Sequence, residues 1–545
     1  MPRIIIVFCF FCLIQHCVAA QERSFGTLPL INKPGIVLAS SGSKKIDSVQ
    51  YRRVLNIYNR LVQARGDFRF PVPSFNLVAE ERRVAGIDYD QLNIALEEKA
   101  LGVCNSFGAD ADAAIAFLLA HELTHYYEKH AWRSGFADDN KDLKIGVEMN
   151  KLADDTANET EADYLGGFLA YSAGYGVFQR GSEIIQGLYK AYGLKNEIAG
   201  YPSLSDRQAL SRRTAERLAN LVDLFEMANL LSATAKHNLA YEYYRYLLLE
   251  YQSREIYNNL GVTVTLSTME EIGTQKYRYP LEMDLESSAQ KAAMLSPGDP
   301  RVQEKFRQAI LHFDAAISMD PNYAPAYLNK ATVYALMGDL VRARFYANVE
   351  ARQASKTGNY PKVAQDIDVL MGIIEARSNN VKGAQALFTK ADKAGSALAK
   401  INLRVLLKQP PLKEIPAGGL WLDAEKIENF SLDEVARDLR VDPKKTIMVK
   451  SRMEFLQTPP IGTASTVFVN LVNNDQKTIF HLTEPGYTGK TARKIGLGDP
   501  RANVVKVYGE PARSLETPRG QIMVYQNILF IIGKDGKLER WANYQ

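Results

Sequence analysis

The stretch Ala120-His121-Glu122-Leu123-Thr124-His125 decides how the rest of the chain is interpreted. It ends a run of good helix formers, Ala113 to Leu119, so we predict one continuous helix here. Residues four apart lie on the same helix face, so the imidazoles of His121 and His125 can reach a single metal ion. Glu122 lies about 100° around the helix from His121, close enough to address a metal-bound water without being a ligand.

A third ligand is predicted on a second helix, which contains Asn158-Glu159-Thr160-Glu161-Ala162-Asp163. Glu159 and Asp163 share a face, whereas Glu161 points about 200° away from Glu159 and is the weaker candidate. Glu159 can complete a His, His, Glu site that leaves one position open for water. Asp163 can accept the second N–H of a ligand histidine and fix its orientation. Gly166 and Gly167, one turn further on, would let the two helices lie close together.

This pair of motifs resembles the gluzincin family of the CaaX prenyl proteases and heat-shock membrane proteases. The likeness is closest to its soluble periplasmic members with tetratricopeptide repeats, which are outer-membrane assembly proteases and chaperones. The resemblance implies a zinc endopeptidase with one Zn²⁺ per chain, bound by His121, His125 and Glu159, and with Glu122 as general base. His130 matches a histidine often seen just after the motif. On a continuous helix it lies about 180° from His121, so we expect a hydrogen-bonded structural histidine rather than a ligand.

One stretch departs from the family pattern. Members often carry His-Pro-x-x-x-x-Arg after the second helix, with a histidine that stabilises the transition state or blocks the site. The corresponding run here starts at Tyr201-Pro202 and ends at Arg207. The Tyr201 hydroxyl can donate a hydrogen bond to a developing oxyanion, which makes Tyr201 a candidate catalytic residue. The alternative is a packing residue in a turn.

The N-terminus has the pattern of an export signal. Arg3 precedes the apolar run Ile4 to Ile14, and Val18-Ala19-Ala20 is a small-residue cleavage signature, so residues 1–20 are a predicted signal peptide and the mature chain is predicted to be periplasmic. A lipoprotein anchor at Cys17 is the less favoured alternative, because large residues precede it. Cys104, the single cysteine after the signal, is expected to be a small buried hydrophobic residue.

The mature chain divides into three predicted parts. Residues 21–220 are the predicted metallopeptidase domain, in which strand-like runs over 74–79 and 92–106 precede the histidine helix. The second run is expected to form a strand that borders the substrate cleft and offers its edge to an extended substrate. Residues 221–408 contain recurrent small residues, and Ala309 to Ala343 is 34 residues, the tetratricopeptide period. The alternative is a generic helical bundle. An irregular insert over 273–300 breaks the period.

A Pro/Gly-rich linker over 409–419 leads to a C-terminal α+β domain over 420–545. Strands are expected over 446–449, 465–472, 477–482, 522–525 and 528–532, with a hairpin at Lys534-Asp535-Gly536-Lys537 and a helix within 495–511. The module resembles small domains of envelope lipoproteins and suggests a protein contact. The predicted fold class is therefore multidomain and mainly α: an α+β zincin-like domain, an α-solenoid of repeats and a small α+β domain.

These features lead to two functional hypotheses. The first is an exported zinc endopeptidase that cleaves unfolded or misassembled envelope proteins and uses its repeats to dock clients or assembly partners. The second is a chaperone or scaffold for envelope assembly with a latent peptidase site. The near-balanced net charge of +4 over 545 residues argues against nucleic acid as a partner. Gly486 to Thr491 ends like a phosphate-binding loop, but Glu484 replaces its first glycine, so no nucleotide is expected.

Overall fold

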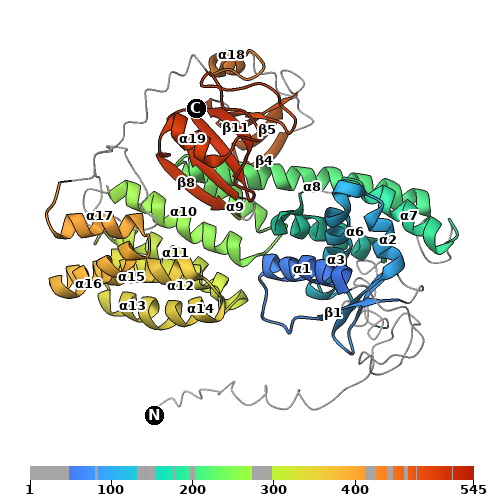
Figure 1. Ribbon diagram of the computed structural model, residues 1–545, viewed down its shortest axis with the longest axis horizontal. Coiled ribbons are helices and arrows are strands. Elements are labelled where there is room, and N and C mark those ends of the chain that lie inside the picture. The colour runs from blue at the N-terminus through green and yellow to red at the C-terminus, as the bar shows by residue number, and fades with distance from the viewer. Residues whose placement is uncertain are drawn as a thin grey trace, which may run out of the picture.

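The computed structural model describes residues 48–79, 84–131, 142, 155–176, 179–196, 203–272, 298–410, 425–437, 446–458, 464–473, 475–517 and 520–545. The predicted signal peptide, Tyr201, and most of the linker and of the 273–300 insert lie outside these residues. The protein is mostly helical, with a β-sheet domain at its C-terminal end (Figure 1). This confirms the prediction that the chain is mainly α, with a C-terminal domain that contains a sheet. Within the described ranges, no helix combines the length and apolar character needed to cross a bilayer.

The N-terminal part packs helices against a small three-stranded sheet. Its elements are α1 (Ser48–Arg65), β1 (Ser74–Val78), β2 (Ala85–Asp88), β3 (Asn93–Glu97), α2 (Glu98–Asn105), the short 3₁₀ turn η1 (Gly108–Asp110) and α3 (Ala111–Tyr127). The sheet order is β1-β3-β2, with β1 parallel and β2 antiparallel to β3.

The expected strand over 92–106 is correct only in its first half. Residues 98–105 form α2 instead, because Glu98, Lys99, Ala100 and Leu101 are good helix formers and only Val103 is β-branched. The expectation that this strand offers a free edge is also wrong, because β3 is paired on both sides. In the described part of the sheet, β1 and β2 are the edges, and β2 packs against α3.

The second helix of the candidate site follows. Its segment comprises α6 (Asp155–Ala170), the π-helical turn η2 (Tyr171–Tyr175), α7 (Gly181–Tyr192) and α8 (Leu204–Ala233). Gly166 of α6 lies directly on the backbone of α3: a Cβ added there would come within 2.9 Å of the Ala120 carbonyl carbon and the His121 nitrogen. Gly167 does not contribute to this approach, because it faces Leu218 of α8. The predicted boundary at residue 220 falls inside α8.

Helical pairs then stack into a curved array, seen at the lower left of Figure 1. They are α9 (His237–Leu247), α10 (Arg254–Ile272), α11 (Pro300–Met319), α12 (Ala324–Met337), α13 (Leu340–Phe345), the π-helical segment η5 (Tyr346–Ala351), α14 (Arg352–Thr357), α15 (Pro361–Arg377), α16 (Val381–Lys393) and α17 (Ala397–Leu406).

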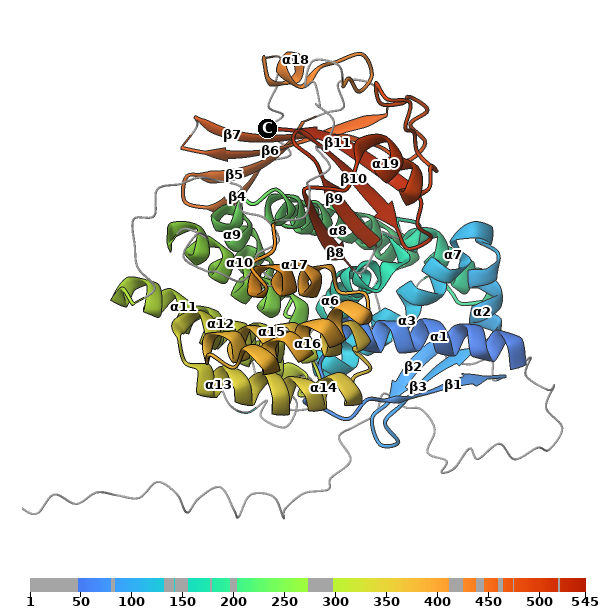
Figure 2. The ribbon, with the colours of Figure 1, turned by 60° about the vertical axis from the view of Figure 1, so that its left-hand side comes forward.

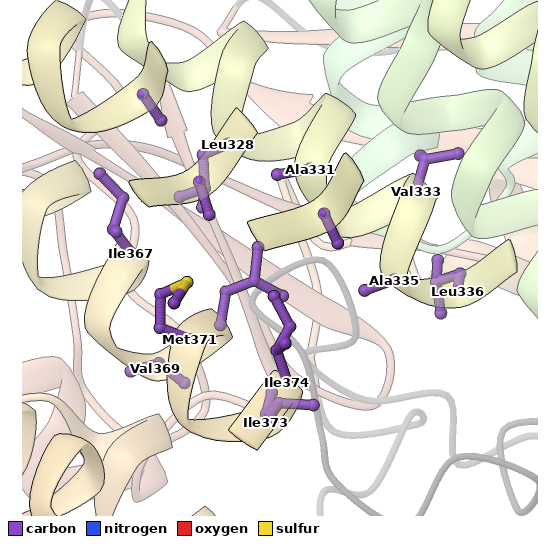
Figure 3. Close-up of a cluster of buried hydrophobic side chains, with 14 of the residues drawn as sticks. Leu328, Ala331, Val333, Ala335, Leu336, Ile367, Val369, Met371, Ile373 and Ile374 are labelled. Atoms are coloured by element: carbon purple, nitrogen blue, oxygen red, sulfur yellow. The ribbon is translucent and has the colours of Figure 1, made fainter. Parts of the chain in front are cut away.

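A glycine facing a phenylalanine recurs in this array. Gly261 of α10 lies against Phe313 of α11, and Gly372 of α15 lies against Phe388 of α16. In both pairs an added Cβ would meet the ring at 2.5 Å, so only glycine allows this helix spacing. Figure 3 shows how buried side chains of α12 and α15, among them Leu328 and Met371, fill the space between successive pairs.

The C-terminal part is an eight-stranded antiparallel sheet in the order β4-β5-β6-β7-β11-β10-β9-β8. Its strands are β4 (Thr446–Lys450), β5 (Met453–Thr458), β6 (Ser465–Val472), β7 (Gln476–Thr483), β8 (Arg513–Thr517), β9 (Gly520–Val524), β10 (Ile528–Gly533) and β11 (Leu538–Tyr544), and its helices are α18 (Leu432–Arg437) and α19 (Arg501–Tyr508). The structure contains every strand predicted for this part and the predicted hairpin, whose second strand is β11; it adds β5 and β8, which we did not predict.

This sheet packs against the helices that precede it in the chain. Figure 2 shows it lying directly over α8, α9 and α10. Phe455, Phe468 and Phe480 share one hydrophobic core with residues of these helices and with Phe168 of α6. The hydroxyl of Tyr243 in α9 also donates to Oδ1 of Asn470 in β6, at 3.0 Å. The helices α6, α8, α9 and α10 and the sheet therefore pack as one body.

Candidate metal centre

The two motif histidines face each other on α3. Nε2 of His121 lies 3.0 Å from Nε2 of His125, and both side chains are largely buried. Glu159 of α6 brings its carboxylate to the same point: Oε2 is 3.5 Å from Nε2 of His121, and Oε1 is 3.4 Å from Nε2 of His125. These three are the one group of potential metal donors found in the described part of the chain.

The Nδ1 atoms of the two histidines are each hydrogen-bonded, that of His121 to an aspartate of α6 and that of His125 to His130. Nδ1 of His121 lies 2.8 Å from Oδ1 of Asp163, so this nitrogen donates and Nε2 is left with a lone pair. Nδ1 of His125 lies 2.7 Å from Nδ1 of His130, and Nε2 of His130 lies 3.2 Å from Oε2 of Glu161. The last contact makes Nε2 of His130 the donor, so its Nδ1 accepts from His125.

The expected position of His130 was wrong. The helix ends at Tyr127, and Lys129 adopts a left-handed conformation with φ of 57°. This turn brings the buried His130 ring back beside His125 instead of opposite His121. As expected, His130 is hydrogen-bonded and does not belong to the group formed by His121, His125 and Glu159. It also connects His125 to Glu161, a link that we did not predict.

This donor set fits a tetrahedral cation. With both Nδ1 atoms acting as donors, the two Nε2 atoms face each other at 3.0 Å, a spacing that a cation bound to both, or a proton shared between them, makes favourable. A tetrahedral zinc ion with bonds of about 2.0–2.1 Å places its ligand atoms about 3.3–3.4 Å apart. The observed separations of 3.0, 3.4 and 3.5 Å are close to that geometry.

Arg207, near the start of α8, lies beside Glu159. Its Nη2 is 3.2 Å from Oε2 of Glu159. Burial raises the pKa of Glu159, but the hydrogen bond and charge of His121 and the charges of His125 and Arg207 lower it to about 2. We did not predict a role for Arg207, although it ends the run that begins at Tyr201.

The charges of His121 and Glu159 affect the pKa of Glu122. Burial raises the pKa of Glu122 to about 7; the charge of His121 opposes this rise, and that of Glu159 adds to it. Burial lowers the pKa of His121, but its contacts with Asp163 and Glu159 outweigh this and hold its pKa well above the usual value. Next to β2, the hydroxyl of Tyr89 donates to the backbone carbonyl of His125 at 3.2 Å, so the end of this edge strand lies against the histidine helix.

Other residues singled out in the sequence lie apart from this centre. Cys104 is fully buried, and burial raises the pKa of its thiol to about 12, so it is an inert core residue. After Gly486 to Thr491 the chain makes a turn, and the next helix, α19, begins only at Arg501. A phosphate-binding loop requires a helix directly after its Gly-Lys-Thr, so this segment lacks that architecture.

Comparison with known proteins identifies the repeats. A family model described as a tetratricopeptide repeat matches residues 312–345, which contain the second half of α11, α12 and α13. This confirms a tetratricopeptide repeat in the segment that contains Ala343, where the 34-residue spacing predicted one. No curated protein matches the chain.

Proposed function

We propose that the chain is a zinc-dependent endopeptidase with a second, protein-docking part. The observation that carries the proposal is the arrangement of His121, His125 and Glu159, whose donor atoms face one point at the spacing of a tetrahedral ion. Three protein ligands leave one position for water, which is typical of catalytic rather than structural zinc. Bound zinc would supply Lewis acidity that lowers the pKa of water and polarises the scissile carbonyl.

The roles of the side chains follow from their places. Glu122, next to His121 in the sequence, takes the proton from the attacking water and returns it to the leaving amine. Asp163 holds His121, and His130 with Glu161 holds His125, so that both Nε2 atoms stay aimed at the metal. Tyr201 is the proposed oxyanion donor, and Arg207 steadies the Glu159 carboxylate.

The proposed substrates are polypeptides, because of the features of β2 and of the helical repeats. Among the described strands, none pairs with the outer edge of β2, which lies beside α3, so an extended polypeptide could align with this edge. Tetratricopeptide arrays present concave surfaces that bind other proteins. With the predicted signal peptide, these features favour unfolded or misassembled periplasmic polypeptides as clients and envelope assembly proteins as partners.

The test compares two single variants of the full chain. Glu122→Gln is expected to bind one zinc per chain and to lose casein cleavage, whereas Glu159→Ala is expected to lose zinc as well. Glu183→Ala, an exposed carboxylate on α7, is the control and keeps both properties. Wild-type casein cleavage by Glu122→Gln, or full zinc content in Glu159→Ala, would show that the assignment is wrong.

The second candidate is a chaperone or scaffold with a latent peptidase site. It is favoured by the common core that joins the repeats, the sheet and α6, since such packing can gate access to the centre. Cells carrying Glu122→Gln in place of the wild type separate the two. If they behave as the wild type while cells lacking the whole protein do not, the scaffold function is the physiological one.

A further inference from the structure

A cleft of about 600 Å³ lies apart from the metal donors, none of which lines it. It is formed where α1, the end of α6, α8, the start of α10 and the β10–β11 turn meet. Phe168, which lines it, follows Glu159 by nine positions on α6, about 14 Å along the helix axis. The cleft is therefore a second site, connected to the first by one helix.

One wall of this cleft is apolar. Phe168, Phe225 and Ile256 line it, and the two phenylalanine rings meet edge to face at 5.8 Å between centroids. These side chains come from three different helices, so the wall is held rigidly by the core beneath it. It can accept an aliphatic or aromatic group of a ligand.

The opposite wall is a row of carboxamides on α1. Asn56, Asn59 and Gln63 all line the cleft, at spacings of three and four residues that place them on one helix face. In the described ranges, no residue hydrogen-bonds to their side chains. Each carboxamide carries both a donor and an acceptor, so the row matches the alternating N–H and C=O groups of a peptide backbone. The row spans about 10 Å, the length of about three extended residues.

Two cations from different elements also line the cleft. Arg60 belongs to α1 and Lys534 to the β10–β11 turn. Burial lowers the pKa of Lys534, and the positive charge of Arg60 lowers it further, so the two cations lie close enough to repel. The one carboxylate among the described lining residues is Glu255, whose Oε1 accepts from Nε of the buried Arg254 at 2.8 Å. The charge that remains is positive and favours an anion.

We propose that this cleft binds the last residues of a polypeptide through their free C-terminal carboxylate. The carboxylate lies between Arg60 and Lys534, the carboxamides of α1 pair with about three residues of backbone, and the terminal apolar side chain packs on Phe168 and Phe225. The inference goes beyond the proposed peptidase and does not depend on the metal: it assigns a place where a client or a cleaved product is held by its end.

The experiment measures binding by fluorescence anisotropy with full-length Glu122→Gln protein, in which the probe should not be cleaved. The probe is an N-terminally labelled hexapeptide that ends in leucine, used as the free acid and as the C-terminal amide. The acid is expected to bind at least about tenfold more tightly than the amide, because only the acid pairs with two cations.

Single variants locate the site. Lys534→Gln and Arg60→Gln are each expected to weaken binding of the acid about threefold to tenfold and to leave the amide unchanged. Asn59→Ala is expected to weaken both peptides equally. Lys537→Gln changes an exposed lysine in the same turn that does not line the cleft, and it is expected to have no effect.

Three results would overturn the proposal: equal binding of acid and amide, no effect of Lys534→Gln, or an equal effect of Lys537→Gln. Dodecanoate provides a further comparison, since it has the same carboxylate and an apolar body but no backbone amides. If dodecanoate binds in a Lys534-dependent way and the peptide acid does not, the site is one for fatty anions. None of these binding measurements depends on zinc content, so they test the cleft independently of the proposed peptidase.

Discussion

Removal of the Asp163 carboxylate is expected to weaken zinc binding without removing a ligand. Oδ1 of Asp163 accepts from Nδ1 of His121 at 2.8 Å, and this contact would keep the lone pair of Nε2 directed at the proposed zinc. Loss of such an acceptor raises the metal dissociation constant about 10- to 100-fold, which corresponds to about 1.4–2.7 kcal/mol. Asp163→Ala should therefore still bind one zinc per chain, but with a dissociation constant higher by that factor.

The same reasoning predicts a smaller effect for Glu161→Ala. Glu161 acts on His125 only through His130, and about a third of its side chain is exposed, so water can replace it. We expect its dissociation constant to rise less than about tenfold. The two effects are not expected to add in free energy, because His121 and His125 contact each other and share Glu159 as a partner.

The assay is a zinc titration against a chromophoric chelator of known affinity, at fixed pH and ionic strength. Glu183→Ala, with an exposed carboxylate on α7, is the matched control. An unchanged dissociation constant in Asp163→Ala would refute the argument, because it would mean that His121 is oriented without this contact. A complete loss of zinc would be equally contrary, since it would make Asp163 a ligand.

Three further predictions concern stability. Gly166→Ala places a Cβ against the backbone of α3 and should lower the free energy of unfolding, measured by urea titration, by about 1–3 kcal/mol. Gly102→Ala on α2, whose added Cβ meets open space, should raise that free energy by about 0.5–1 kcal/mol. Equal effects of the two variants would contradict the close approach of α6 to α3. Asp320→Ala removes the partner of a buried arginine and should cost about 3–5 kcal/mol, against less than about 1 kcal/mol for the exposed Glu304→Ala on α11. Burial lowers the pKa of His481 to about 4, below the unfolded value of 6.5, so the unfolded state binds the proton first and stability should fall as pH drops from about 6.5 to about 4. Between pH 7.5 and 5 this loss is about 2 kcal/mol, and it should be absent in His481→Leu; a variant with the same pH slope as the wild type would refute it.

The parts of the candidate site that depend on local geometry could be predicted from the sequence. Spacings of four residues place His121 with His125 and Glu159 with Asp163 on helix faces whatever the rest of the chain does. The position of His130 depends on a single turn at Lys129, whose left-handed conformation has no strong signal in a lysine. Arg207 meets Glu159 across 48 residues, and no local pattern contains that contact.

The same limit applies to the fold. The strands β6 and β7 carry enough apolar residues to be recognised, whereas β8, Arg513-Ser514-Leu515-Glu516-Thr517, has a single one and exists because β9 pairs with it. The fused core of the sheet with α8 and α9 could not be foreseen either. Phe455 and Phe468 predict that one sheet face is buried, but not which helices bury it.

One long helix connects the two ends of this molecule. Near its start, Arg207 of α8 touches the carboxylate of Glu159; further along, Glu226 receives the hydroxyl of Tyr171 at 3.1 Å and Nη1 of Arg540 from β11 at 3.0 Å. These two positions are about 28 Å apart along the axis. A tilt of the rod by about 2° at the sheet end therefore moves Arg207 by about 1 Å, enough to break its contact. α8 is thus one continuous helix that touches the C-terminal sheet through Arg540 and the glutamate beside the histidines through Arg207.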